Sequence, residues 1–128
     1  MFFSRVFIAA SAAVAVSAQI GSIEYFVYAP AKSDVGVLDR QKAAQAAHLA
    51  HADGVYAEGN LDSGGPILTA SSVAGNLTFA GSAFLLKVEN LEAAKKVVTD
   101  DAYYTGDVWD PEKIVVLPYI PYYRASSA

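Results

Sequence analysis

The order of strand-like and helix-like segments is the feature that most constrains this chain. Four segments are rich in β-branched and aromatic residues, which favour extended backbone. Two others lack proline and are rich in alanine, which favours helix. In chain order we predict a strand at Ile23 to Tyr28, a helix at Val35 to Ala52 that stops near Asp53-Gly54, strands at Val55 to Leu61 and Ser82 to Glu89, a helix capped by Asn90, and a strand at Ile114 to Ile120.

This β-α-β-β-α-β order is that of the ferredoxin-like fold, an α+β arrangement in which one antiparallel sheet carries both helices on a single face. The other face of such a sheet is left bare. Alternation along the strands predicts apolar side chains on it, namely Tyr25, Val27, Phe84, Leu86, Val115 and Leu117. A second copy of the sheet is the simplest cover, so we expect a homodimer packed sheet to sheet.

The stretch from Ser63 to Gly81 separates the second and third predicted strands. It contains four glycines and one proline and is too long for a plain hairpin turn. We therefore expect a loop that partly covers a pocket. Within it, Asn76-Leu77-Thr78 is an N-glycosylation sequon, which makes Asn76 a candidate glycosylation site.

The N-terminal segment has the three parts of a secretory signal peptide. Residues 1–5 hold one positive charge, residues 6–16 form an apolar run, and small residues precede Gln19. The apolar run is shorter than the ~20 residues that cross a membrane. We expect cleavage after Ala18, a secreted single domain of residues 19–128, and no membrane anchor. A mitochondrial presequence is the alternative, because no acidic residue precedes Glu24.

Composition excludes several classes of function. The chain has no cysteine, so disulfides, thiolate zinc sites and a catalytic cysteine are impossible. Its charges are scattered and sum to −4, which leaves no basic stripe for a nucleic-acid backbone. The Gly64-Gly65-Pro66 run lacks the lysine and the spacing of a phosphate-binding loop. We expect no nucleic-acid partner and no cofactor.

Several short motifs follow one another in a fixed order. They are a Tyr-rich first strand, Ala47-His48-Leu49, Gly65-Pro66, the run Glu89 to Ala94, Asp101-Ala102-Tyr103, Gly106 and a final apolar strand. With these motifs, residues 23–120 resemble the YCII-related (YciI-like) family of dimeric α+β barrels. The resemblance implies a ferredoxin-like dimer with a pocket that holds His48 and Asp101.

His48 and Asp101 are accordingly the candidate catalytic residues. In an enzyme, Asp101 would fix the tautomer of His48, and His48 would move a proton in an isomerisation, elimination or hydration of a small molecule. Tyr28 or Tyr103 would donate a hydrogen bond to a developing oxyanion. Gly65-Pro66 would line the substrate pocket.

The surroundings of His48 depart from the family pattern. Relatives commonly carry Arg-Pro where this chain has Gln45-Ala46, so a cation three residues before the histidine is lost. Two classes of function therefore remain: a cofactor-free enzyme, and a secreted binding or structural module without chemistry.

A helical wheel gives the expected position of each histidine. It places His48 at the margin of a buried face formed by Leu38, Gln45, Leu49 and Ala52, and turns His51 toward solvent. Two histidines three residues apart can share a metal ion, but only Asp53 and Asp101 could complete the ligand set. We expect no metal.

Overall fold

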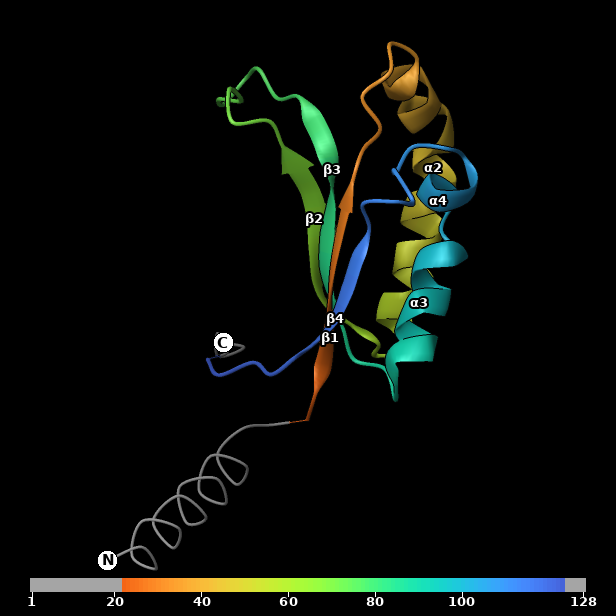
Figure 1. Cartoon of the computed structure of the whole chain (residues 1–128), viewed down its shortest axis with the longest axis vertical. Helices are drawn as coiled ribbons and strands as arrows, with labels where there is room; N and C mark the ends of the chain where they lie inside the picture. The colour runs from red at the N-terminus through yellow and green to blue at the C-terminus, as the bar shows by residue number, and fades with distance from the viewer. Residues whose placement is uncertain (1–21, 124–128) are drawn as a thin grey trace, which may run out of the picture.

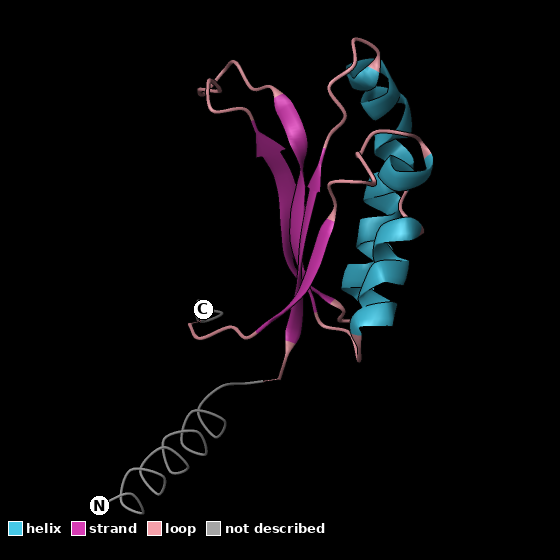
Figure 2. Cartoon of the chain, viewed as in Figure 1, coloured by secondary structure: helices cyan, strands magenta, loops and turns pink. Residues whose placement is uncertain are grey.

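The computed structural model describes residues 22–123, which form one antiparallel sheet with helices along one face. The elements are β1 (Glu24–Pro30), α2 (Val37–Ala57), β2 (Leu61–Leu68), β3 (Phe79–Leu86), α3 (Leu91–Thr99), α4 (Ala102–Thr105) and β4 (Val115–Tyr119). The strand order is β2-β3-β1-β4, and all neighbours are antiparallel. Figures 1 and 2 show the helices on a single side of the sheet. The predicted ferredoxin-like α+β fold is confirmed.

The predicted signal peptide, residues 1–18, lies outside the described residues, as does its cleavage site. Within residues 22–123, no helix combines the length and the apolar character that crossing a membrane requires.

The side chains of β1 alternate between a covered and an uncovered face of the sheet. Tyr25, Val27 and Ala29 are buried, whereas Phe26 and Tyr28 are exposed. Because paired residues share a face, the register of β1 with its neighbours assigns the rest of the sheet. Opposite the buried positions of β1 lie Leu86, Phe84 and Ser82 of β3 and Val116 of β4.

The predicted composition of the bare face was therefore wrong in part. Four of its members, Tyr25, Val27, Phe84 and Leu86, lie on the face that the helices cover. Val115 and Leu117 do lie on the uncovered face, together with Phe26, Tyr28 and Tyr119. Alternation separates two faces of a strand, but it does not say which of two apolar faces receives the helices.

Helix α2 continues past Asp53-Gly54, where the sequence predicted its end, and runs to Ala57. The residue that stops it is Gly59, which has a φ of 78° and donates its amide hydrogen to the Tyr56 carbonyl at 2.9 Å. Glycine adopts this left-handed conformation at little cost. Val55, predicted to begin a strand, is instead buried on α2. Burial of a valine, about 1.5–3 kcal/mol, offsets the cost of about 1 kcal/mol for a glycine inside the helix.

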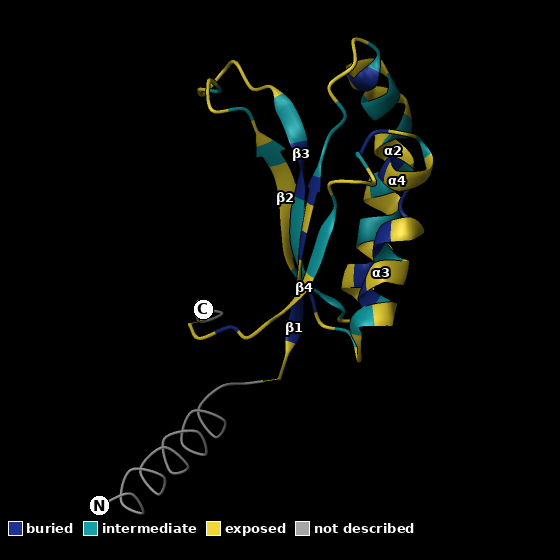
Figure 3. Cartoon of the chain, viewed as in Figure 1, coloured by how far each residue is buried: buried dark blue, intermediate teal, exposed yellow. Residues whose placement is uncertain are grey.

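The predicted loop from Ser63 to Gly81 is mostly a β-hairpin. β2 and β3 take both ends of it and leave residues 69–78 as the connection. β2 is an edge strand, and an edge position tolerates glycine and proline, so it accommodates Gly64-Gly65-Pro66 in register with β3. The connection is largely exposed, and Asn76 lies within it (Figure 3).

The second half of the fold follows its local sequence signals closely. Asn90 caps α3 as predicted, accepting the amide hydrogen of Ala93 at 2.8 Å. A further short helix, α4, follows Asp101, and β4 lies at the other edge of the sheet, where Pro118 is tolerated.

Candidate active site

His48 and Asp101 are in direct contact, although 53 residues of sequence separate them. Nδ1 of His48 lies 2.8 Å from Oδ1 and 3.0 Å from Oδ2 of Asp101. The two side chains are 15% and 5% exposed. Asp101 is also the N-cap of α4, and its Oδ1 accepts the amide hydrogen of Tyr103 at 2.8 Å. The helix cap therefore fixes the carboxylate that meets the imidazole.

This contact determines the tautomer of His48. A carboxylate accepts hydrogen bonds, so Nδ1 carries the hydrogen and Nε2 keeps a free lone pair. The imidazole is held flat against the Tyr103 ring, with centroids 3.8 Å apart and planes 6° from parallel. The Trp109 ring meets it edge-on at 6.0 Å. The orientation of the ring is thus set by one hydrogen bond and two aromatic contacts.

Tyr103 presents a hydroxyl beside the imidazole. Its oxygen accepts a hydrogen bond from Nε2 of Gln41 at 2.8 Å. Burial raises the pKa of this phenol, and the Gln41 hydrogen bond opposes that shift only in part. The hydroxyl therefore stays protonated near neutral pH, and its own hydrogen is available to a ligand.

These groups line a cavity of about 280 Å³ between the helices and the sheet. Its apolar walls come from α2, α3, β2 and β3, and its polar groups come from α2, β3 and the start of α4. The lining residues are Gln41, Gln45, His48, Leu49, His51, Ala52, Val55, Leu61, Gly64, Gly65, Pro66, Phe79, Ser82, Phe84, Leu86, Val97, Asp101 and Tyr103. Among residues 22–123, neither a lysine nor an arginine belongs to this lining.

Of the predicted substrate-binding residues, Tyr103, Gly65 and Pro66 line the same cavity as His48 and Asp101. Tyr28 does not. It is 40% exposed on the uncovered face of the sheet, because it stands one residue from the buried Val27 and strand side chains alternate. The predicted role for Tyr28 in this pocket was wrong.

The segment from Ser63 to Gly81 does line this pocket, as predicted, but it does so through strands instead of a loop. The glycines and proline that line it, Gly64, Gly65 and Pro66, belong to β2, and no residue of the 69–78 connection reaches it. The hairpin extends beyond the sheet, away from the helices (Figure 1).

His51 lies in the cavity wall instead of facing solvent as predicted. Its Nε2 donates to the Val97 carbonyl at 2.9 Å, which connects α2 to α3. Within residues 22–123, no group of three or more His, Asp or Glu side chains is arranged to hold a metal ion.

The helical wheel misplaced the buried face of α2. Leu38 and Leu49 are 42% and 52% exposed, whereas Val37 and Val55 are buried. Alanine dominates this helix, so its sequence has little amphipathic contrast from which to orient a wheel. Gln41 was missed for the same reason, although it precedes His48 by seven residues and two helical turns bring it to the same face.

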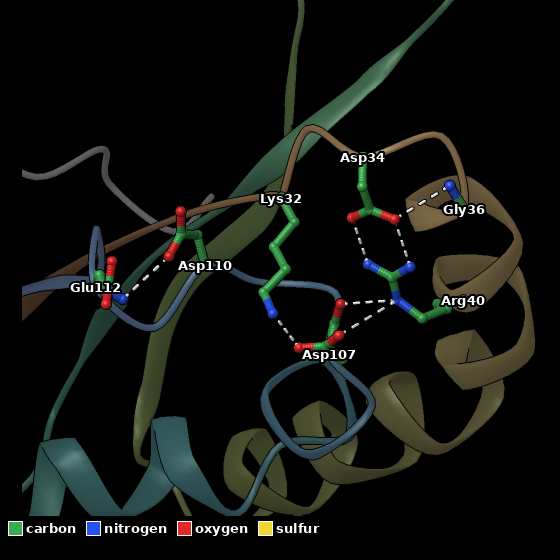
Figure 4. Close-up of polar contacts among 7 residues, drawn as sticks. All are labelled: Lys32, Asp34, Gly36, Arg40, Asp107, Asp110 and Glu112. Carbon is green, nitrogen blue, oxygen red and sulfur yellow. Dashed lines mark hydrogen bonds and ion pairs between the residues drawn. The ribbon is translucent and has the colours of Figure 1, made fainter.

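An ion cluster fixes the segment that carries Asp101 and Tyr103. Arg40 makes two hydrogen bonds of 2.7 Å to the carboxylate of Asp34 and a third, of 2.9 Å, to the Asp107 carbonyl (Figure 4). Lys32 pairs with the Asp107 side chain. The Arg40 hydrogen bonds hold the pKa of the Asp34 carboxyl at about 2. This cluster ties the connection after α4 to the first turn of α2.

The fold and the cavity define a ferredoxin-like α+β protein with a His-Asp pair in a small, largely apolar pocket. Residues 23–117 match the YCII-related domain, and the chain belongs to that family. It is also similar in structure to 5-chloro-2-hydroxyhydroquinone dehydrochlorinase from Burkholderia phenoliruptrix AC1100 in complex with 2,5-dihydroxybenzoquinone. That match has a TM-score of 0.64 and 21% identity, and covers 75% of this chain and 92% of that chain. A comparison with curated proteins found no match.

Proposed function

We propose that this chain is a cofactor-free enzyme that transfers a proton on a small organic molecule, with His48 as the general base and acid. The observation that carries the proposal is the contact of His48 Nδ1 with Asp101 in the wall of a cavity. Because Asp101 accepts the Nδ1 hydrogen, Nε2 is the basic nitrogen available to a bound molecule.

The chemistry follows from the groups at the cavity. His48 Nε2 takes a proton from a carbon or a hydroxyl of the substrate, and the imidazolium that forms is stabilised by the Asp101 carboxylate. Tyr103 donates its hydrogen to the substrate oxygen on which negative charge develops. Return of the proton to another atom completes an isomerisation, and departure of a leaving group completes an elimination.

The structural comparison supports a small-molecule role. The protein of similar fold is a dehydrochlorinase of a substituted hydroquinone, so this fold accommodates small-molecule chemistry. For this chain the reaction class rests on its own residues, and above all on the His48 and Asp101 pair.

The tautomer of His48 provides the first test. In the Asp101→Asn variant, asparagine still caps α4, but its amide group can donate to Nδ1 and shift the hydrogen to Nε2. Nitrogen-15 NMR of the imidazoles should show hydrogen on Nδ1 in the wild type and on Nε2 in the variant. His51 is the internal control, because the Val97 carbonyl holds its hydrogen on Nε2 in both proteins. A wild-type His48 with its hydrogen on Nε2 would overturn the proposed pair.

Proton transfer itself is tested by isotope exchange. Small molecules that raise the melting temperature are incubated with the protein in D2O. A native-state ligand at 100 times its dissociation constant adds about 2.7 kcal/mol to the free energy of unfolding. We expect at least one such ligand to exchange a carbon-bound hydrogen with the wild type but not with His48→Gln. Ligands that bind without any exchange would instead favour a second function, that of a binding module.

That second function is a binding module with the same fold. It is favoured by the structural use of Asp101, which caps α4 whether or not His48 is reactive. In such a module, the hydrogen bond between His48 and Asp101 would only stabilise the packing of α4 on α2.

We further propose that the chain acts as a homodimer. The uncovered face of the sheet carries Phe26, Tyr28, Leu117 and Tyr119 with exposed fractions of 37–54%. Adjacent exposed apolar side chains of this number are typical of an interface. A second sheet with the same face would bury them isologously.

Secretion is likewise a proposal, and it rests on the composition of residues 1–18. Mass spectrometry should find a mature N-terminus at Gln19 in the culture medium. An intact Met1, or protein found only inside the cell, would contradict it. A mitochondrial product would support the alternative presequence.

A further inference from the structure

We infer that the cavity selects uncharged, ring-sized molecules bearing a hydroxyl beside a carbonyl, and that it excludes carboxylates and phosphates. The inference rests on the proposed function and deepens it, because it names the class of molecule that the same cavity binds. Three independent observations carry it: the charge of the lining, the size and polarity of the walls, and the arrangement of donors and acceptors.

The charge of the lining disfavours anions. Its ionisable groups are one carboxylate, one phenol and two histidines, and none of its described residues is a lysine or an arginine. The Asp101 side chain is 5% exposed and supplies the only formal charge of the lining when the imidazoles are neutral. An anionic ligand would lose its hydration beside this carboxylate without gaining a counter-charge, which is costly in a buried site.

Three cations in or just before the first half of α2 do not belong to the cavity lining. Arg40 is engaged by Asp34 and by the Asp107 carbonyl, and Lys32 by the Asp107 side chain, in the cluster of Figure 4. Lys42 is exposed and does not belong to the cavity lining. The position one turn before His48 is held by Gln45, a neutral amide that lines the cavity. It can donate a hydrogen bond to a neutral oxygen but cannot neutralise a carboxylate.

The size and walls of the cavity favour one small ring system. Its volume of about 280 Å³ is just below the ~300–1,000 Å³ of pockets for drug-sized ligands. Phe79, Phe84 and Leu86 form its wall on the sheet side, and Val55 and Val97 contribute from the helices. Gly64 adds no side chain to this wall, and a Cβ there would lie 3.1 Å from the Cβ of Phe84. A flat apolar ring fits these surfaces better than a flexible polar chain.

The polar groups require both a donor and an acceptor on the ligand. Tyr103 has accepted a hydrogen bond from Gln41, so its hydroxyl is free to donate to a carbonyl oxygen. His48 Nε2 is free to accept from a hydroxyl, because Nδ1 is held by Asp101. The two rings are stacked at 3.8 Å, which places the donor and the acceptor on adjacent parallel planes. A hydroxyl next to a carbonyl satisfies both groups at once.

A matched pair of probes tests the inference. 2-Hydroxybenzamide and 2-hydroxybenzoate have nearly the same shape, but near neutral pH the first is uncharged and the second is an anion. Binding to the full wild-type protein is followed by calorimetry and by the NMR signals of His48. We expect 2-hydroxybenzamide to bind and to move the His48 signals, and 2-hydroxybenzoate to bind about tenfold more weakly or worse.

Two arginine variants complete the test. Gln45→Arg puts a cation into the cavity lining and should reverse the preference toward 2-hydroxybenzoate. Ala50→Arg adds the same charge at an exposed position of α2 outside the cavity and should leave the preference unchanged. Equal or tighter binding of 2-hydroxybenzoate by the wild type would overturn the inference, and so would failure of both probes to bind at millimolar concentration.

The outcome is separable from that of the proposed function. The probes report recognition without chemistry, whereas the tautomer and deuterium experiments report proton transfer. Selective binding of the neutral probe with no exchange of any ligand would support the ligand class and overturn the enzyme.

Discussion

Asp101 serves the site through two hydrogen bonds that share one carboxylate. One bond caps α4 and the other orients His48. Tyr103 is similarly shared, since its ring stacks on His48 while its hydroxyl meets Gln41. At the scale of single residues, Asp101 and Tyr103 are therefore each held at two points.

The Tyr103→Phe variant tests the part played by the phenol. At neutral pH it should lose about 0.5–1.5 kcal/mol of stability, because the hydrogen bond with Gln41 disappears while the ring packing remains. Urea unfolding of both proteins measures this difference. Retention of full stability would contradict the bond to Gln41.

The wild type and Tyr103→Phe should also differ in how their free energy of unfolding depends on pH. Burial raises the pKa of Tyr103 in the folded state, so on raising the pH the unfolded chain ionises first, near pH ~10. The unfolded state then binds fewer protons than the native state, and stability falls as the pH rises toward the native pKa. Tyr103→Phe lacks this ionisation, so its unfolding free energy should fall less between about pH 9 and pH 11. Equal alkaline slopes would contradict the prediction.

At the scale of elements, two glycines near the end of α2 have different roles. Gly54 lies inside the helix with no atom within 4 Å of an added Cβ, whereas Gly59 follows the helix with a φ of 78°. Only Gly59 needs the left-handed backbone conformation, which residues with a side chain adopt at an energetic cost.

Alanine at each glycine should therefore have opposite effects. Gly54→Ala should raise the free energy of unfolding by about 0.5–1 kcal/mol, through helix propensity. Gly59→Ala should lower it by about 1 kcal/mol or more, because alanine is strained at positive φ. Thermal and urea unfolding of the two variants provide matched controls for each other. Destabilisation by Gly54→Ala instead would indicate that the helix ends there, as the sequence alone suggested.

At the scale of the whole molecule, the two faces of the sheet differ in what covers them. Leu86 is 1% exposed beneath the helices, whereas Leu117 is 54% exposed on the other face. A charge at these two positions should therefore affect different equilibria: folding at Leu86 and assembly at Leu117.

The proposed dimer gives the corresponding prediction. Leu117→Lys should convert a dimer at micromolar concentration into folded monomers, since a lysine in an apolar interface loses its hydration without a partner. Leu86→Lys should unfold the chain. Light scattering gives the mass and circular dichroism the folded content. A wild-type protein that is monomeric in the same measurement would contradict the dimer.

The sequence by itself determined the features that local signals encode. The order of strands and helices was predicted from the composition of short segments, although the second strand was placed at Val55 to Leu61 instead of Leu61–Leu68. Asn90 is recognisable as a cap because a cap bonds within three residues. The motifs around His48 and Asp101 indicated one pocket through family resemblance, and the structure places the two side chains in contact.

Only the tertiary structure decided which partner each surface meets. The strand at Leu61–Leu68 contains Gly64-Gly65-Pro66 and becomes recognisable only by pairing with β3. Tyr28 and Val27 are adjacent in an apolar strand. Because the helices pack on one face of the sheet only, Val27 lies in the core and Tyr28 is exposed to solvent. Gln41 lies in an alanine-rich helix whose orientation is set by contacts with α4 and the sheet. These outcomes depend on pairing and burial between segments far apart in the chain, which local propensity does not record.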